Sequence, residues 1–296
     1  MLKIQNIVLF LHTKQECMEK DLIQHSSFWY EETSLSLFRE QPCHIEGGFI
    51  FFCIRGNAVI SSGIQEYSIV KNSTTMFLSG MTFFIKSASE DFLVRLFTFS
   101  KELYSEIVLQ LPPAFSQFMN ETSAYEHEAN SHTLKSVYVL MDMAKLVHQE
   151  RNNSSANILQ RNFLQTYMLY VFGYVQPLLD HLINKHTRRQ RLFHRFISLV
   201  YTYCQKHRDV TFYANSLCIS PRNLYGITFE YSSGLSPKQL IDKQFVLEIK
   251  ALLASSDLTI SEIAYKLNLP DQSYLCRYFK RHIGISPTEY RNQKNN

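Results

Sequence analysis

The chain has 296 residues, 45% hydrophobic and 19% charged, a balance that excludes an intrinsically disordered protein and allows two domains of ordinary size. The net charge of +4 is unevenly distributed: up to His186 there are 14 Lys and Arg against 18 Asp and Glu, and after it 16 against 8. A strongly basic final third is typical of a domain that binds a polyanion.

The cysteines and the apolar runs bear on compartment and metal content. The six cysteines form no Cys-x-x-Cys pair and have no metal-ligand spacing with the histidines, so we expect reduced thiols and no bound metal. The run Ile7–Leu11 is too short for a signal peptide. Phe163–Leu179 is interrupted by polar residues and falls short of the roughly 20 apolar residues that span a bilayer. We therefore expect a cytoplasmic protein with no membrane partner.

Short apolar segments separated by Gly, Asn and Ser follow one another from about Leu35 to Ser100. They predict β-strands, and their spacing of about ten residues is typical of a sandwich or jelly-roll barrel. No helical pattern lies between them, so a parallel α/β sheet is not expected. The predicted strands are Phe49–Ile54, Ala58–Ser61, Tyr67–Val70, Met76–Leu78, Phe83–Lys86 and Phe92–Phe99.

Helical spacing replaces this pattern farther along the chain. Apolar residues recur at helical intervals from Leu134 to Val147, and a second apolar helix is predicted from Ile158 to Ile183, bent or broken at Pro177. Such a pair has two interpretations, a subunit interface that makes a homodimer or two helices packed on their own barrel. The run 186–191 is the predicted linker, and its three arginines could contact phosphates or form a solvated hinge.

The final third contains an internal repeat at an offset of 50 residues. Gly234-Leu-Ser-Pro and Gly284-Ile-Ser-Pro each combine a glycine that ends a helix with a serine N-cap and a proline at the first helical position. We predict two helix-turn-helix units joined by a helix from Pro237 to Ala254. At 1.5 Å per residue this helix is about 27 Å long. It could hold two recognition helices roughly one DNA turn, about 34 Å, apart.

The second unit has the clearer pattern. Thr259 with Glu262 predicts a capping box for its first helix, which ends at Asn268. A second helix starts at Asp271 or one residue earlier and ends at Gly284. An ordinary helical hairpin with a solvated basic face is the alternative to a helix that enters the DNA major groove. The outer face of the second helix has Gln272, Ser273, Cys276, Arg277, Lys280 and Arg281.

The first unit is the weaker copy. Ser220 caps its second helix, and Gly226 within that helix costs about 1 kcal/mol. Thr228 stands where the second unit has Phe279, and Phe229 comes one residue late. We therefore place the main sequence readout in the second unit. The residues that the first unit is expected to expose are Arg222, Asn223 and Tyr225.

Three segments of the second unit resemble the signature of the AraC-type (AraC/XylS) transcription regulators. They are Ile-Ser-Glu-Ile-Ala-Tyr-Lys-Leu from Ile260, Asp-Gln-Ser-Tyr-Leu from Asp271, and Tyr-Phe-Lys-Arg-His-Ile-Gly-Ile-Ser-Pro-Thr-Glu-Tyr-Arg from Tyr278. The match departs at the turn, where Asn268-Leu-Pro replaces the usual Gly-Phe-Ser, and at Leu275, which is usually Phe. The region before the basic domain is loosely similar to the sensory half of that family.

The resemblance implies an α+β chain with three parts: a cupin-like β-barrel sensory domain over 1–130, a helical dimerisation segment and linker over 131–186, and an all-α DNA-binding domain with two helix-turn-helix units over 187–296. It implies a bacterial, cytoplasmic, sequence-specific regulator, more often an activator. The implied partners are double-stranded DNA, RNA polymerase, a small-molecule effector and a second copy of the chain. Neither catalytic residues nor a cofactor are expected.

The outer face of the second recognition helix has the chemistry for base readout. Gln272 can pair with adenine and Arg277 with guanine through two hydrogen bonds each, about 1 to 3 kcal/mol per good pair. Cys276 is small enough for contact with a thymine methyl group. Lys280 and Arg281 lie farther along the helix, where phosphates are the expected partners. Ser273 and its neighbour Tyr274 have the alternative of capping and packing.

The rival interpretation is a metal-dependent cupin-type enzyme with an accessory helical domain. It requires a set of metal ligands, yet the strand region has no His-x-His pair, and only His44 with Glu46 comes near a suitable spacing. The chain also has no Gly-x-Ser-x-Gly, phosphate-binding glycine loop or His-Glu-x-x-His motif. A ligand-insensitive architectural protein or repressor is a third interpretation, and it differs only in what the barrel binds.

Overall fold

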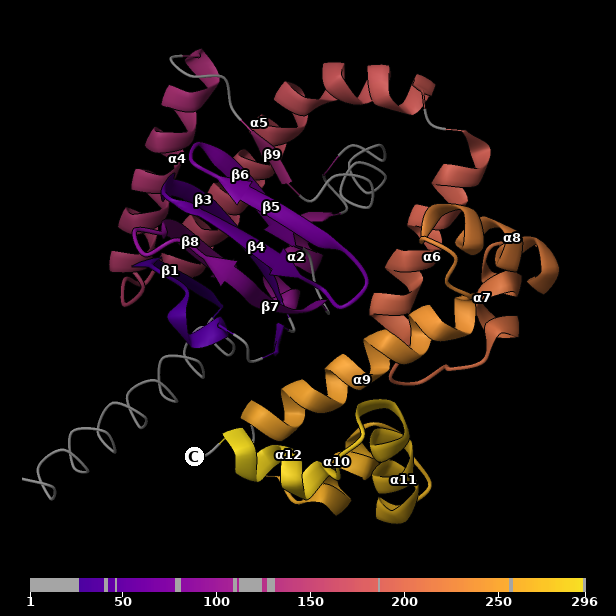
Figure 1. Ribbon diagram of the computed structural model, residues 1–296. Helices are drawn as coiled ribbons and strands as arrows, with labels where there is room; N and C mark the ends of the chain where they lie inside the picture. Colours follow the sequence, from indigo (N-terminus) through magenta and orange to yellow (C-terminus); the bar gives the residue numbers. More distant parts are fainter. Residues whose placement is uncertain are drawn as a thin grey trace, which may run out of the picture.

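Two antiparallel sheets face each other in the first part of the chain, and helices form the rest (Figure 1). The fold is thus α+β, with a β-sandwich followed by a helical domain, as the sequence predicts. Among the helices of the described residues, none combines the length and the apolar character needed to cross a membrane. The computed structural model describes residues 27–39, 42–45, 47–77, 81–108, 111, 124–126, 131–185, 187–255 and 258–294.

The larger sheet has the strand order β1-β8-β3-β6-β9, and the smaller sheet has the order β2-β7-β4-β5. All six predicted strands are present, whereas the sequence analysis missed one strand before Leu35 and two strands of only three residues. The strands are β1 Phe28–Thr33, β2 Cys43–Ile45, β3 Gly48–Arg55, β4 Asn57–Ser61, β5 Glu66–Val70, β6 Ser73–Phe77, β7 Met81–Ala88, β8 Leu93–Phe99 and β9 Ala124–Glu126.

Strand β3 is buried on both of its faces. Phe49 and Phe51 belong to the cluster between the two sheets, whereas Ile50 and Phe52 belong to the cluster between the larger sheet and the helices that cover it. Side chains alternate between the two faces of a strand, so a strand at the centre of three layers needs apolar residues at every position. This explains why Phe49–Ile54 is a continuous apolar run.

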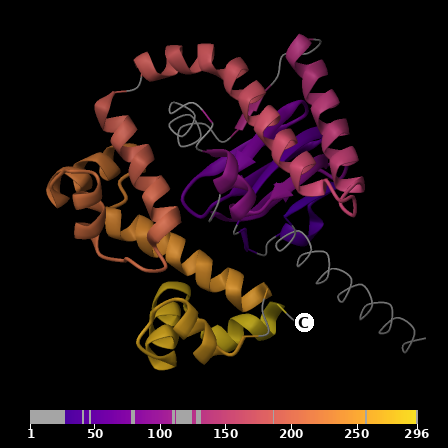
Figure 2. The same cartoon turned by 180° about the vertical axis from the view of Figure 1, so that it is seen from behind.

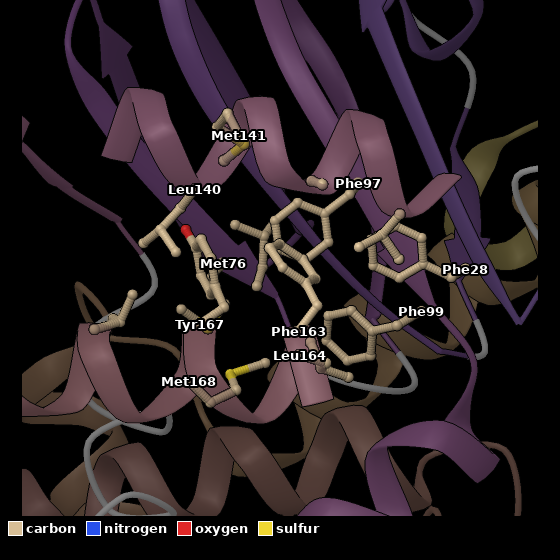
Figure 3. Packing of buried hydrophobic residues seen from close by; sticks show 14 of the residues in the cluster. Phe28, Met76, Phe97, Phe99, Leu140, Met141, Phe163, Leu164, Tyr167 and Met168 are labelled. Carbon is tan, nitrogen blue, oxygen red and sulfur yellow. The ribbon is translucent and has the colours of Figure 1, made fainter. Parts of the chain in front are cut away.

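Helices α4 and α5 cover the outer face of the larger sheet (Figure 2). Their inward residues meet aromatic residues of β1 and β8, with Phe163 of α5 packed against Phe28 and Phe97 (Figure 3). Helix α5 is continuous through Pro177, so the predicted break is absent, but the helix changes direction along its length (Figure 1), as the alternative prediction of a bend expects. A proline removes one backbone hydrogen bond, and the rest of this long helix retains its ladder. The two covering helices are α4 His132–Gln149 and α5 Ala156–Lys185, and two shorter helices of the same part of the chain are η1 Ser36–Phe38 and α2 Lys101–Val108.

Helix α9 organises the C-terminal domain. Its first half packs in one apolar cluster with α6, α7 and α8, and its second half packs in another with α10, α11 and α12. The two helix-turn-helix units therefore share one continuous helix, with a hydrophobic core on either half (Figure 1). The helices are α6 Arg188–Tyr203, α7 Val210–Ser216, α8 Pro221–Tyr231, α9 Pro237–Ser255, α10 Ile260–Lys266, α11 Gln272–Ile283 and α12 Pro287–Lys294.

Candidate nucleic-acid interface

The second helix-turn-helix unit consists of α10 and α11. Thr259 and Glu262 form the predicted capping box at the start of α10. Asn268 adopts the left-handed conformation with φ 52°, and Asp271 accepts a hydrogen bond of 2.7 Å from the backbone N–H of Tyr274. The N-cap of α11 is therefore Asp271, which compensates for the proline that precedes it. Gly284, with φ 91°, ends the helix as predicted.

Helix α11 has a buried face and an exposed face. Leu275, Tyr278 and Phe279 are buried against α9 and α12. The Tyr278 hydroxyl also donates a 2.7 Å hydrogen bond to Asp242 of α9, which fixes the rotation of α11 about its own axis. The residues that the sequence predicts at the DNA surface are on the opposite face. Gln272, Ser273, Arg277, Lys280 and Arg281 are exposed, and Cys276 is half-buried.

The first unit, α7 and α8, repeats this geometry with different side chains. Cys218 takes the left-handed place of Asn268, with φ 55°, and Ser220 caps α8. Leu224, Ile227 and Thr228 are buried, so Thr228 does occupy the inward place that Phe279 has in the second unit. Arg222, Asn223 and Tyr225 are exposed as predicted. Phe229 is also exposed, and the sequence analysis did not include it among the candidate residues.

Arg208 joins the two units. Its guanidinium lies 4.6 Å from the centroid of the Phe245 ring and donates hydrogen bonds of 3.3 Å and 3.2 Å to the carbonyls of Leu267 and Asn268, at the end of α10. A cation at a helix C-terminus is favourable, and this one also bridges the α6–α7 connection to the second unit. Arg208 therefore helps to set the relative orientation of α8 and α11.

The arginines of the predicted linker belong instead to the first turn of α6. Thr187 and Gln190 form a capping box there, a signal that the sequence analysis missed. Arg189 pairs with Glu230 of α8 at 2.8 Å, an exposed ion pair between two helices of the same domain. Helix α6 thus begins inside the predicted linker 186–191, and Arg189 is not part of a solvated hinge.

Comparisons with known proteins concern mainly this helical domain. Residues 213–293 match the family model described as a helix-turn-helix domain. The arabinose operon regulatory protein of Salmonella typhimurium is 31% identical over 85 residues, 29% of this chain and 30% of that protein. The HTH-type transcriptional regulator ExsA of Pseudomonas aeruginosa is 28% identical over 131 residues, 43% of this chain and 45% of that protein. The chain therefore spans less than half the length of either relative.

Among solved structures, unsaturated fatty acid bound ToxT from Vibrio cholerae aligns over 90% of this chain and 96% of its own, with 16% identity and a TM-score of 0.45. The domain match begins at Tyr213 inside α7 and includes α8, α9 and the whole second helix-turn-helix unit. Residues 213–293 form a helix-turn-helix domain of the AraC/XylS type. Both of these relatives are transcription regulators, so the comparisons favour that interpretation over the cupin-type enzyme.

The AraC-type domain contacts the sandwich through Glu248, a buried carboxylate on α9. The sequence analysis missed this residue. Glu248 accepts hydrogen bonds from Thr82 of β7 at 2.6 Å, from Gln244 at 2.7 Å and from Gln205 at 3.0 Å. Its other partner is the Nδ1 atom of His44 on β2, at 2.8 Å from Glu248 Oε2. We call these five residues the Glu248 network. An acidic residue inside the apolar run Phe245–Ile249 is the signal that could have revealed it.

The Glu248 network holds an ionised carboxyl group away from solvent. Burial raises the pKa of Glu248, but attraction to His44 and hydrogen bonds from His44, Thr82 and Gln244 outweigh it, so the pKa lies below its ordinary value. Thr82 also lies 2.9 Å from His44 Nδ1. The single hydroxyl proton of Thr82 goes to Glu248, so Nδ1 of His44 is the donor toward Thr82 and Glu248.

His44 therefore has a role other than metal binding. The sequence analysis considered it as a metal ligand with Glu46, and Glu46 lies outside the described residues. His44 points to α9 and interacts with Glu248 and Thr82. Within the part of the chain that the structure describes, no group of three or more His, Cys, Asp or Glu side chains is arranged to hold a metal ion.

A cavity of about 420 Å³ lies between the sandwich and the AraC-type domain, next to the Glu248 network. Its sandwich wall comes from the end of β4, the loop after it and the middle of β7, and its other wall comes from α9 and the last turn of α11. The cavity therefore touches both the β-sandwich and α11. Apolar and cationic side chains share the lining, which consists of Ser61, Gly63, Phe84, Leu235, Gln239, Asp242, Lys243, Val246, Leu247, Lys250, His282 and Ile283.

Proposed function

We propose that the protein is a sequence-specific, DNA-binding transcription regulator of the AraC type, an activator that contacts RNA polymerase and responds to a small molecule. The observation that supports DNA binding most strongly is the pair of capped recognition helices, α8 and α11, packed on the single helix α9 with polar and cationic residues outward. We further propose the division into a sensory domain over 1–130, a dimerisation segment over 131–186 and a DNA-binding domain over 187–296.

Affinity for DNA should come mainly from lysine and arginine side chains that neutralise phosphates. Each neutralised phosphate contributes about 0.9 to the slope of log K against log salt, so six contacts would weaken binding about a thousandfold between 50 and 200 mM salt. Duplexes selected from a random pool with the full-length chain provide the probe, and a mobility-shift titration at several salt concentrations provides the measurement. Failure to select any duplex, or binding insensitive to salt, would contradict the proposed function.

A homodimer is the second part of the proposal, with α4 as its interface. One face of α4 packs on the sheet, yet Val139, Met143 and Leu146 on its outer face are 65%, 45% and 60% exposed. In an antiparallel pair of α4 helices with Val139 opposite Leu146 of the second copy, Lys135 would lie opposite Glu150. An apolar stripe with opposite charges at its ends is therefore complementary to a second copy of itself.

Replacing both Val139 and Leu146 by aspartate should convert the dimer into a monomer, because four carboxylates would meet in the centre of the interface. Analytical ultracentrifugation at micromolar concentration measures the change. Val70→Asp, at an exposed apolar residue on β5, is the matched control and should leave the dimer intact. A wild-type monomer, or a double variant that stays dimeric, would refute α4 as the interface.

We place the effector in the cavity between the two domains. Its apolar residues suit a hydrocarbon group, and Lys243 and Lys250 suit an acid, so the expected ligand is a small apolar molecule with a carboxylate.

Apolar carboxylic acids should raise the Tm of the protein, whereas their neutral amides should not, because ligand binding stabilises the folded state by mass action. Lys243→Ala should abolish this shift, and Lys266→Ala, at an exposed lysine of α10 outside the cavity, should retain it. A shift that Lys243→Ala preserves would exclude this site.

A further inference from the structure

Two aromatic rings stand side by side on the outer face of α8. Tyr225 is 51% exposed and Phe229 is 54% exposed. Their ring centroids are 6.1 Å apart with an angle of 16° between the planes, so the rings are stacked on each other. Aromatic side chains usually bury their large apolar surface. A stacked, exposed pair on a recognition helix therefore indicates a surface that binds a partner.

The register of α8 explains why these rings face outward. Counted from their N-caps, Ser220 and Asp271, the buried residues of α8 and α11 coincide: Leu224, Ile227 and Thr228 correspond to Leu275, Tyr278 and Phe279. The same count places Tyr225 and Phe229 where α11 has Cys276 and Lys280. The first unit thus presents aromatic rings at the positions where the second presents a thiol and an ammonium group.

The surroundings favour DNA as the partner over an apolar protein surface. Arg222 is exposed one turn before Tyr225 on the same face, as a cation facing phosphates would be. The pair also continues the surface that the proposed function assigns to DNA, since the corresponding face of α11 has Arg277 and Lys280. In the major groove the apolar group available to such rings is the C5 methyl of thymine.

We propose that Tyr225 and Phe229 form an apolar platform that reads thymine methyl groups in the DNA segment under the first unit. The two units would then differ in their main readout: α8 would select thymines by apolar contact, and α11 would select guanine and adenine by hydrogen bonds, with Cys276 as its one candidate for a thymine methyl contact. This inference rests on the proposed function, because it presupposes that α8 enters a major groove.

Replacing thymine by deoxyuridine tests the platform, because the two bases pair identically and differ only in the C5 methyl group. A selected duplex is scanned by replacing each thymine in turn, and Kd is measured for the full-length protein and for Tyr225→Ala/Phe229→Ala. For at least one thymine, loss of the methyl should weaken wild-type binding about fourfold, the value of one buried methyl group. The double variant should bind the thymine and uracil duplexes equally. Both side chains are exposed, so the substitutions leave the cores of the domain intact.

Lys280→Ala is the matched control, because it removes the corresponding residue of the second unit. It should weaken binding to every duplex and still distinguish thymine from uracil at the same positions. The inference is overturned if no thymine shows a wild-type preference that the double variant lacks, or if the double variant binds all duplexes like wild type, as a protein-docking role for the rings would predict. Wild-type protein that binds no duplex in a salt-sensitive way would instead defeat the proposed function itself, and this inference with it.

Discussion

Replacing Glu248 by alanine should lower the free energy of unfolding by about 3 to 5 kcal/mol, the cost of removing one partner from a buried ion pair. Glu248 is almost completely buried, and its loss leaves His44, Thr82, Gln205 and Gln244 without their shared acceptor. A urea unfolding curve monitored by circular dichroism measures the difference.

The exposed ion pair between Glu66 and Lys86 provides the control. Its two charged atoms are 2.7 Å apart, close to the 2.8 Å between His44 and Glu248, but both side chains are about half exposed. Surface pairs of this kind contribute at most about 1 kcal/mol, so Glu66→Ala should shift the curve little. Equal effects of the two substitutions would show that the Glu248 network does not stabilise the docked domains.

The same network gives a pH dependence of known sign. Because the folded-state pKa of Glu248 lies below its ordinary value, the stabilisation is fully present above the unfolded pKa of about 4.3 and is lost as the pH falls through the folded pKa. The free energy of unfolding of the wild-type chain should therefore fall more steeply as the pH is lowered from 5 than that of Glu248→Gln, which has no carboxyl group at this position. Parallel pH profiles would contradict the assignment.

Docking at Glu248 bears on regulation because α9 is also the spacer between the recognition helices. Thr82 and His44 of the sandwich contact this helix near its middle, between the halves that support α8 and α11. A ligand in the neighbouring cavity touches α9 at Lys243, Val246 and Leu247. An effector that alters the docking of α9 would therefore change how both recognition helices are presented to DNA.

The elements that local chemistry determines were predictable from the sequence. The capping box at Thr259, the left-handed turn at Asn268 and the stop at Gly284 each depend on a few neighbouring residues, and all three are confirmed. The strands were predictable where they are long and apolar. β2 and β9 were missed because three residues give no pattern, and β1 was missed because its apolar run is only three residues long and ends in the acidic pair that follows Tyr30.

What the sequence could not reveal depends on contacts between distant segments. The Glu248 network joins residues up to 204 positions apart in the sequence, namely His44, Thr82, Gln205 and Glu248. No pattern among the neighbours of any one of them indicates that they are in contact. The outward position of Phe229 was partly predictable, because Thr228 occupies the inward place that corresponds to Phe279 and so leaves Phe229 one position beyond the buried face. Which exposed residues contact bases stays a prediction, since exposure alone does not distinguish them.

Replacing Arg277 by alanine should weaken specific DNA binding by about 1 to 3 kcal/mol, a factor of about 5 to 150 in Kd, and should relax the base preference at one position. Arg277 is exposed on α11 one turn after Ser273, and the hydrogen bond between Tyr278 and Asp242 holds the helix so that this side chain faces outward. Kd measured on a selected duplex and on its single-base variants provides the test.

A phosphate contact has a different effect, which makes the assignment of roles on α11 decidable. Lys280→Ala should weaken all duplexes to a similar extent and reduce the salt slope by about 0.9, because it removes one neutralised phosphate without removing a base contact. Arg161→Ala, at an exposed arginine of α5 far from both recognition helices, should change neither quantity. If Arg277→Ala lowered affinity uniformly and left base preference intact, Arg277 would be a phosphate contact and the specificity of this unit would have to come from Gln272 and its neighbours.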